Sequence, residues 1–487
     1  MSGLLLQGGT VLDPEGPLRQ ADVRVEGDTI TEVEAALTRV GERVVDAGGA
    51  VVMPGLVNAH THSGQSLEQG TTPNLPLDLW MMWAVYGGVE LSSEDAYTAA
   101  ATGALEMLQT GCTAVLDHAN VVVAAFAEHA EALMAAYDDV GMRAVVAPLV
   151  QDRDFFESLP LHLVPLERPQ PLSQGEDPAA LAALCAAFVE HWRDRHPRLV
   201  PALGPSAPQR CSDEFLARMS ALVRELGASV HTHLLETKSQ AVATRARYGR
   251  SVVEHLDELG LLGSHASFAH GVWLTDEEYR RVLERGSVLV HSPISNLRCG
   301  SGVMPLQRLL PMGLPVALGS DGAASNDNQN MFETMKIASL VQTLYGTYPS
   351  WPEASDIWRM CVVGGATALG QKIGRVVPGA KADLVVMRSD SHATVSKEGL
   401  VTSIVFSEHG ESVDIVIVGG EIVYEGGRST RVDEAQLRAR GRDLNDRLHH
   451  HVDRRREAFG SVEEVLSRML EAVEAEELEL PHRRLDG

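Results

Sequence analysis

Short apolar segments alternate with amphipathic segments through the middle of the chain, and this alternation predicts repeated strand–helix units. A helix is predicted over 93–110, where Gly111 ends it, and another from Ser212 to Gly227. Thr275 and Glu278 form a capping box that begins a further helix. Strands are predicted at 112–117, 228–233, 267–270, 287–291 and 315–321. This long run of units favours a (β/α)₈ barrel over a doubly wound sheet.

The two ends of the chain have a different pattern, with short strands separated by Gly and Asp turns. Such segments occur near the start, and similar ones return at 379–387 and 413–420. Because chain ends often lie close together, we predict one small β domain assembled from both termini. The predicted organisation is a β domain from 1–53 and 378–430, a barrel over 54–377, and a charged helical extension over 431–487.

Polar side chains end most of the predicted central strands. An apolar run at 51–57 leads to His60 and His62, which are two residues apart and therefore face the same side of a strand. A lone histidine at a strand end is usually only hydrogen-bonded, but in a barrel all these ends share one face. The pattern therefore predicts a site, with imidazole as a metal ligand. The candidates are His60, His62, His118, His233, His270, His291 and Asp321.

Composition narrows the class of protein. The chain has 487 residues, of which 44% are hydrophobic and 22% charged, as in an ordinary globular protein. Its formal net charge of -25 argues against binding to nucleic acid or to an anionic membrane. No apolar run approaches the length of a membrane span, and the N-terminus lacks the basic start of a signal peptide. Five widely spaced cysteines without a CxxC pair predict reduced thiols and a cytoplasmic location.

Several motifs, in their order and spacing, resemble one enzyme superfamily. They are PGLVNAHTH at 54–62, HTHLLE at 231–236, AHGVWLTDEE at 269–278, HSPISNLRCGSG at 291–302, GSDGAASND at 319–327 and PGAKADLVV at 378–386. The chain resembles the amidohydrolase superfamily, in the branch that holds methylthioadenosine/S-adenosylhomocysteine deaminase, guanine deaminase and the triazine chlorohydrolases. The resemblance implies a (β/α)₈ barrel with a β-sandwich built from both chain ends.

The resemblance also implies roles for individual residues. The metal ligands would be His60, His62, His233 and Asp321, with Asp321 also accepting the proton of the attacking water. Glu236 would be the catalytic acid/base, and His270 would orient or polarise the attacked group. His231 is the alternative ligand on the same strand; the family pattern prefers His233 because it places the catalytic Glu three residues after the ligand.

The position of the first lysine bears on the number of metal ions. Members of the superfamily with two metal ions bridge them with a carbamylated lysine that precedes the histidine of the fifth strand. The first lysine of this chain is Lys238, beyond His233. A single divalent ion is therefore predicted, with Zn²⁺ preferred and Fe²⁺ as the alternative; a bridging Glu or Cys stays open.

Substrate-binding residues are less strongly indicated. The segment 70–83 is rich in Pro, Trp and Met, so it either covers the pocket, with Trp80 offering a surface for a flat ring, or is the start of a helix that packs on the barrel. Glu90 occupies the position of a ribose-binding Glu in nucleoside-deaminating relatives, although its flanking residues differ. His118 either faces the pocket or caps its strand. His291 and Asn296 match the substrate side of the family's site.

Together these features predict a metal-dependent deaminase of a purine-, nucleoside-, pterin- or triazine-like ring. In the first alternative, an enzyme with the same type of site hydrolyses a C–Cl, thioether, urea or amide bond. The second is a non-catalytic metal-binding relative, which the intact set of site residues disfavours. The partner is a small-molecule substrate, and the resemblance favours a homodimer or larger homo-oligomer.

Overall fold

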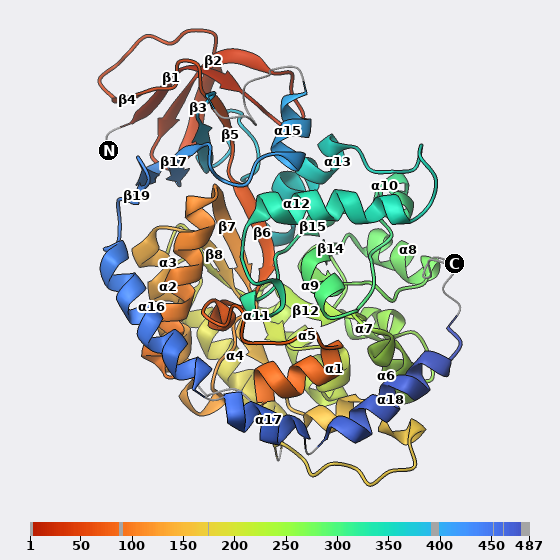
Figure 1. Ribbon diagram of the computed structural model, residues 1–487. Helices are drawn as coiled ribbons and strands as arrows, with labels where there is room; N and C mark the ends of the chain where they lie inside the picture. The colour runs from red at the N-terminus through yellow and green to blue at the C-terminus, as the bar shows by residue number, and fades with distance from the viewer. Residues whose placement is uncertain are drawn as a thin grey trace.

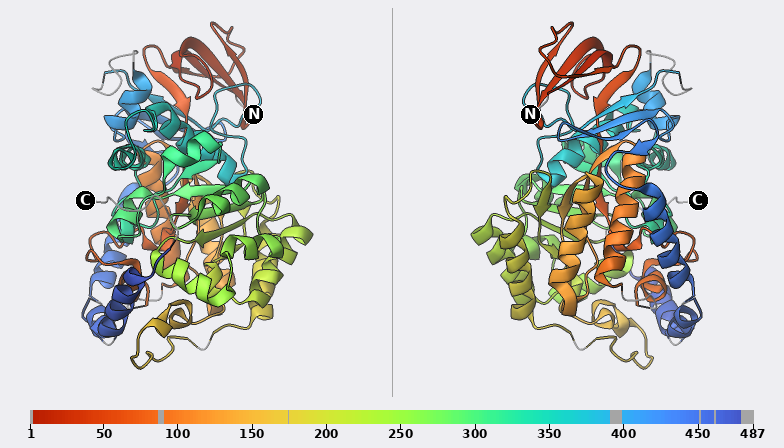
Figure 2. Two further views of the ribbon diagram at one scale, coloured as in Figure 1. Left: turned by 90° about the vertical axis from the view of Figure 1, so that its right-hand side faces the viewer. Right: turned by 90° about the vertical axis from the view of Figure 1, so that its left-hand side faces the viewer.

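Both ends of the chain contribute to one mixed sheet. The computed structural model describes residues 3–86, 91–173, 175–390, 399–450, 452–460 and 462–478. Nine strands form this sheet, in the order β19-β18-β17-β16-β5-β1-β2-β3, with β4 paired to β1. It lies at one end of the molecule (Figures 1 and 2). Its strands are β1 (Leu4–Val11), β2 (Arg19–Glu26), β3 (Thr29–Glu34), β4 (Arg43–Asp46), β5 (Val51–Pro54), β16 (Leu384–Met387), β17 (Val413–Val418), β18 (Glu421–Glu425) and β19 (Arg428–Ser429).

The middle of the chain forms two four-stranded parallel sheets. The first has the order β10-β8-β7-β6 and the second the order β12-β13-β14-β15. Leu203 pairs with Val230 at one junction of the sheets, and the Asp321 amide donates to the His60 carbonyl, 2.9 Å away, at the other. The strands are β6 (Leu56–Thr61), β7 (Cys112–Asp117), β8 (Arg143–Val146), β10 (Leu199–Pro201), β12 (Val230–Leu234), β13 (Ala266–His270), β14 (Val288–His291) and β15 (Val316–Leu318).

Helices follow most of these strands, so the chain is a mixed α/β protein. Their ends agree with the sequence signals: Ser212 caps α5, and Thr275 and Glu278 form the predicted capping box of α8. Gly227 and Gly286 end these helices in the left-handed conformation, which glycine adopts without steric cost. The helices include α2 (Ser93–Gln109), α3 (Phe126–Val140), α4 (Pro178–Trp192), α5 (Asp213–Leu226), α6 (Lys238–Tyr248), α7 (Val252–Leu259), α8 (Asp276–Arg285) and α12 (Met331–Leu340).

Small apolar side chains fill the space between the two parallel sheets. Val57, Ala59, Ala114, Leu116 and Val290 belong to one buried cluster that draws on strands of both sheets. All six residues of β6 are buried, as expected for a parallel strand covered on both faces. This packing fixes the strands, and therefore also the polar residues at their carboxyl ends.

The described part of the C-terminal extension forms three helices, α16 (Glu434–His449), α17 (Val452–Gly460) and α18 (Glu463–Ala475). Figure 1 shows them along the outside of the molecule, in blue. The Phe459 ring lies 5.8 Å from the Trp83 ring, and the buried Arg455 guanidinium pairs with Glu68 at 3.1 Å. The extension therefore supports the segment that carries Trp83. Within the described ranges, no helix is long and apolar enough to cross a membrane.

Candidate active site

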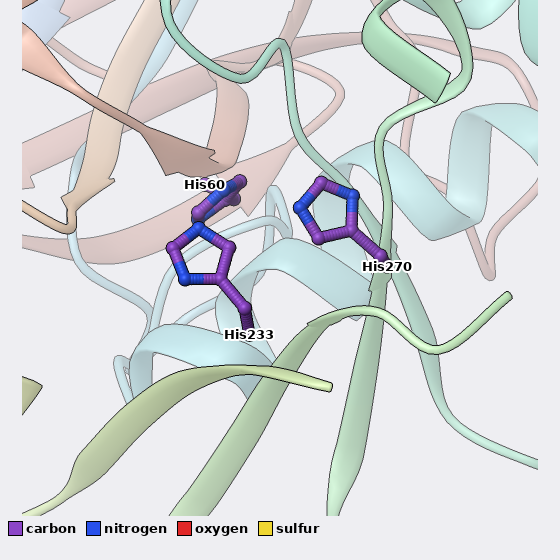
Figure 3. Close-up of side chains that lie close together, drawn as sticks. All are labelled: His60, His233 and His270. Carbon is purple, nitrogen blue, oxygen red and sulfur yellow. The ribbon is translucent and has the colours of Figure 1, made fainter. Parts of the chain in front are cut away.

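The histidines predicted from the strand ends lie close together. Figure 3 shows the rings of His60, His233 and His270, which come from three different strands and face a common space. Three overlapping groups of side chains have ligand atoms within 4.8 Å of one another, and His60 belongs to all three. The groups are His60, His233 and His270; His60, His118 and His231; and His60, His62 and Asp321.

The hydrogen bonds of His62 and His233 fix which nitrogen of each ring faces the site. His62 Nδ1 lies 2.6 Å from the His118 carbonyl oxygen, and His233 Nδ1 lies 2.7 Å from the Ser206 carbonyl oxygen. A carbonyl only accepts, so both Nδ1 atoms carry protons. Burial lowers the pKa of both imidazoles, which are therefore neutral and have a lone pair on Nε2. These Nε2 atoms lie 3.2 Å apart, so a cation between them could bind both lone pairs.

His60 is held in a chain of side chains that ends at Ser267. His60 Nδ1 lies 2.9 Å from His231 Nε2, and His231 Nδ1 lies 2.7 Å from Ser267 Oγ. His60 Nε2 is buried and has no hydrogen-bond partner among the described residues. Both nitrogens of His231 are therefore occupied, whereas His60 Nε2 is available to a ligand.

Asp321 follows β15 in the left-handed conformation. Its φ is +65°, and the Gly322 amide donates to its Oδ1 at 2.7 Å. A Cβ on Gly319 would lie 2.7 Å from His60 Cβ, so only glycine allows this close approach. Asp321 Oδ1 lies 3.6 Å from His60 Nε2 and 3.4 Å from His62 Nε2.

The pKa of Asp321 reflects opposing effects. Burial acts to raise the pKa, but the interaction with His60 and the neighbouring imidazoles outweighs burial and holds the pKa well below its usual range. Asp321 is therefore a carboxylate at neutral pH, and it lies beside the nitrogens that face the site.

Glu236 and His270 form an acid–imidazole pair next to this cluster. Glu236 Oε2 lies 3.5 Å from His270 Nε2, and Ser301 donates a hydrogen bond to Glu236 Oε1 at 2.9 Å. Burial, followed by the charge of Asp321, raises the pKa of Glu236 to about 8. Burial lowers the pKa of His270 to about 4, so at neutral pH Glu236 is a neutral acid and His270 a neutral imidazole.

A cavity of about 170 Å³ opens onto these groups. Trp80 lies in its wall, and the indole N–H donates to the Ala324 carbonyl at 3.3 Å. Trp80 ends the short helix α1 (Leu77–Trp80), which continues as a π-helical turn over Met81–Tyr86. The segment is therefore helical from Leu77 onward and contributes Trp80 to the cavity wall, and contact of Trp80 with the substrate stays a prediction.

The other predicted substrate-side residues have different positions. Asn296 lies 2.9 Å from His270 Nδ1, so it orients that ring from behind and leaves Nε2 facing Glu236. The cavity lining does not include His118 or His291, although both are buried. His118 Nε2 contacts the Gly204 carbonyl at 3.1 Å. Contact of His118 and His291 with the substrate stays a prediction. Glu90 lies outside the described residues.

Several residues of the cavity wall were not predicted from the sequence. Tyr86, Gln151 and Arg210 are three of the polar ones. Gln151 directly follows β9 (Leu149–Val150), and Arg210 closes a turn after β11 (Gly204–Pro205). The rule that functional residues follow strand ends would have indicated both residues, but strands of two residues leave no pattern in the sequence.

The carboxyl ends of these parallel strands bring together imidazoles, a carboxylate and a neutral acid. This arrangement is typical of metal-dependent hydrolases. Residues 51–423 match the sequence profile of the Amidohydrolase family, and the chain belongs to this family. The predicted family is thereby confirmed.

Curated relatives cover most of the chain. The 5-methylthioadenosine/S-adenosylhomocysteine deaminase of Pyrococcus abyssi is 33% identical over 438 residues, which are 89% of this chain and 96% of the relative. The 5′-deoxyadenosine deaminase of Methanosarcina mazei is 33% identical over 442 residues, which are 90% of this chain and 96% of the relative. The chain is accordingly a hydrolytic enzyme of the deaminase type, acting on a carbon–nitrogen bond.

Solved structures of similar fold include an adenosine deaminase from Xanthomonas campestris with bound zinc. It matches with a TM-score of 0.82 and 27% identity over 92% of this chain and 99% of that one. The atrazine chlorohydrolase TrzN from Arthrobacter aurescens TC1, complexed with zinc, matches with a TM-score of 0.79 over 91% of this chain and 100% of that one. Its identity is 23%, so it supports the fold alone.

Proposed function

We propose that the protein is an amidohydrolase with one metal ion that hydrolytically deaminates a nitrogen heterocycle, most closely an adenine-type ring. The ring type follows from the named relatives, which are deaminases of adenosine-like compounds. We further propose that the two parallel sheets close into a (β/α)₈ barrel over 54–377. The terminal strands would form the β-sandwich.

We assign the metal ligands to His60, His62, His233 and Asp321. The observation that carries this assignment is the 3.2 Å approach of two unprotonated Nε2 atoms, those of His62 and His233. His60 Nε2 and Asp321 Oδ1 lie beside them, 3.6 Å apart. Three imidazoles and a carboxylate are a donor set that suits Zn²⁺, with Fe²⁺ as the alternative.

Each residue then has a stated part in the reaction. When bound, a divalent ion lowers the pKa of water towards about 7 and so makes a nucleophile available at neutral pH. The Asp321 carboxylate accepts the proton of the attacking water. Glu236, a neutral acid at this pH, donates its proton to the ring nitrogen next to the attacked carbon. His270, oriented by Asn296, directs Nε2 at the reacting group.

The reaction balances with water as the only co-reactant. The ring carbon gains an oxygen from water and loses its amino group, and the proton held by Asp321 leaves with that group as ammonia. The second proton of the water leaves the added hydroxyl as the ring carbonyl forms, and it restores the acid form of Glu236. The products are the ring carbonyl compound and ammonia.

We expect kcat/KM to fall as the pH rises through about 8. The acid form of Glu236 donates the proton, and this form disappears above the pKa of about 8. A pH–rate profile measures the midpoint of this alkaline limb. Ser301→Ala should move the midpoint upward, because the Ser301 hydrogen bond stabilises the ionised carboxylate. A profile that stays flat to pH 9 in the unmodified enzyme would contradict the role of Glu236.

Two neighbouring histidines allow a matched test of the metal assignment. His233→Ala should abolish retained zinc, because it removes a ligand. His231→Ala should retain zinc but weaken its affinity by about 10–100-fold, because His231 only orients His60. Zinc content after dialysis against a graded chelator measures both effects. The reverse order of losses would assign the ligand to His231.

The products separate deamination from the alternative reactions. Zinc-loaded protein is incubated with matched compounds that carry an amino, chloro or methylthio group on the same adenine-type or triazine ring, and ammonia, chloride and thiol are measured. Ammonia alone supports the proposal. Chloride or thiol release without ammonia would replace it with hydrolysis of a C–Cl or thioether bond.

A further inference from the structure

The part of the cavity wall formed by residues 77–86 has little support from its own hydrogen bonds. It consists of α1, which has four residues, and a π-helical turn of six residues. A helix of this length is not stable alone, and π-helical turns are rare. Trp80 and Tyr86 of this segment line the site cavity. Contacts from other parts of the chain therefore hold these side chains in the cavity wall.

The C-terminal extension supplies such contacts. Helix α17 contacts the π-helical turn and α18 contacts α1, and Figure 1 shows the two blue helices close to α1. One buried apolar cluster contains Leu79 and Met82 of the wall together with Leu466 and Met469 of α18. The residues that match the family profile end at 423, so this support lies outside the matched part of the chain.

Arg455 connects α17 to the turn that follows His62. Its side chain is fully buried, and its Nη2 donates to Glu68 Oε2 at 3.1 Å. The Glu68 carbonyl accepts from the Thr71 hydroxyl at 2.7 Å. The Thr71 carbonyl in turn accepts from the indole N–H of Trp83 at 3.1 Å. The ion pair is therefore linked to the cavity wall through one turn of the chain.

A ring contact reaches the wall from the same helix. Phe459 packs edge-to-face on Trp83, with the ring centroids 5.8 Å apart. Arg455 and Phe459 are four residues apart and therefore lie on the same face of α17. A buried arginine that loses its acid is costly, so α17 cannot move away from the wall without a penalty.

We propose that α17 and α18 hold residues 77–86 in the conformation that binds the substrate ring, with Arg455 as a positioning residue. Arg455 does not line the site cavity, so it acts through Glu68 and the wall. This inference rests on the proposed function only for the reaction that measures substrate binding. Loss of a contact that holds the wall should weaken binding of the substrate and of the transition state alike, which raises KM more than it lowers kcat.

Hydrogen exchange followed by mass spectrometry tests the support of the wall without any reaction. We expect faster exchange in a peptide that covers 77–86 when Arg455 is replaced in Arg455→Met. Phe459→Leu is a milder variant, which removes the ring contact and keeps the ion pair, and it should have a smaller effect on the same peptide. A peptide that covers 230–236 should exchange at the same rate in both variants, because it lies in another part of the cavity wall.

Arg447→Met is the matched control within the extension. Arg447 is exposed on α16 and pairs with Asp95 of α2, so its loss does not touch the wall. We expect no change of exchange in 77–86 and no change of KM in this variant.

Ammonia release from 5′-deoxyadenosine gives KM and kcat for the same variants. Arg455→Met should raise KM by roughly 10-fold, because a hydrogen bond between charged groups is lost, and should change kcat by less than about threefold. Arg455→Lys should recover part of the loss, because it keeps the charge. Retained zinc should stay the same in all variants, because none of them removes an assigned ligand.

Three results would overturn the inference: unchanged exchange in 77–86, an increase of similar size along the whole chain, or faster exchange in 77–86 with an unchanged KM. The second and third results would give Arg455 a merely structural role. If the unmodified protein releases no ammonia, the proposed function fails and the exchange data alone decide the inference. Faster exchange confined to 77–86 would then support it.

Discussion

Glu236→Gln is expected to lower kcat by roughly 10²–10⁴, because glutamine cannot donate the proton that the ring nitrogen must receive. The change keeps the size of the side chain and its contact with Ser301, whose hydroxyl donates to Glu236 Oε1. Steady-state ammonia release measures kcat at the pH optimum. Zinc content should stay the same, because Glu236 is not among the assigned ligands.

A matched control separates proton transfer from damage to the site. Gln240→Glu alters a cavity-lining side chain whose Oε1 accepts from the Glu236 amide at 2.8 Å, without removing the acid. It should cost less activity than Glu236→Gln. A Glu236→Gln variant with more than a tenth of the original kcat would reject Glu236 as the proton donor.

Asp383→Asn is expected to lower the free energy of unfolding by about 3–5 kcal/mol, because it leaves a buried arginine without its counter-ion. Arg143 and Asp383 are both about 1% exposed and form a two-pronged pair, with Nε–Oδ2 at 2.7 Å and Nη2–Oδ1 at 2.9 Å. The pair joins β8 of the parallel sheet to the residue before β16 of the nine-stranded sheet. Urea unfolding followed by circular dichroism measures the loss.

Two further variants test the reason for that loss. Arg438→Leu breaks an exposed pair with Glu434 and should cost less than about 1 kcal/mol. Replacing Arg143 and Asp383 together by leucine should cost less than Asp383→Asn alone, because no unpaired charge is left. Similar losses for Asp383→Asn and Arg438→Leu would contradict the account of this buried pair.

The sequence predicted local features well, because their causes are local. The capping box of Thr275 and Glu278 and the glycine after α5 depend on neighbouring residues only, and both occur where expected. The strand ends were also predictable, because buried parallel strands are apolar until the chain reaches the polar face. His60, His62, His270 and Asp321 were found in this way.

Other features depend on contacts between residues distant in the sequence or on specific hydrogen bonds, and no sequence pattern predicts these. His231 and His233 are two residues apart on one strand, so periodicity gives them the same direction. Their hydrogen bonds differ, because His231 contacts His60 and Ser267 while His233 contacts Ser206. The pair of Glu68 with Arg455 joins residues 387 positions apart. The position of Arg210 in the cavity wall likewise results from the fold.

The central claim is that one metal ion and Glu236 together deaminate a heterocycle. The most direct measurement is a titration of zinc into metal-free protein, with ammonia release from 5′-deoxyadenosine followed at each addition. We expect activity to rise in proportion to zinc and to level off at one ion per chain, with no ammonia from Glu236→Gln at any point. Activity that levels off only at two ions, or ammonia release without any metal, would contradict the account.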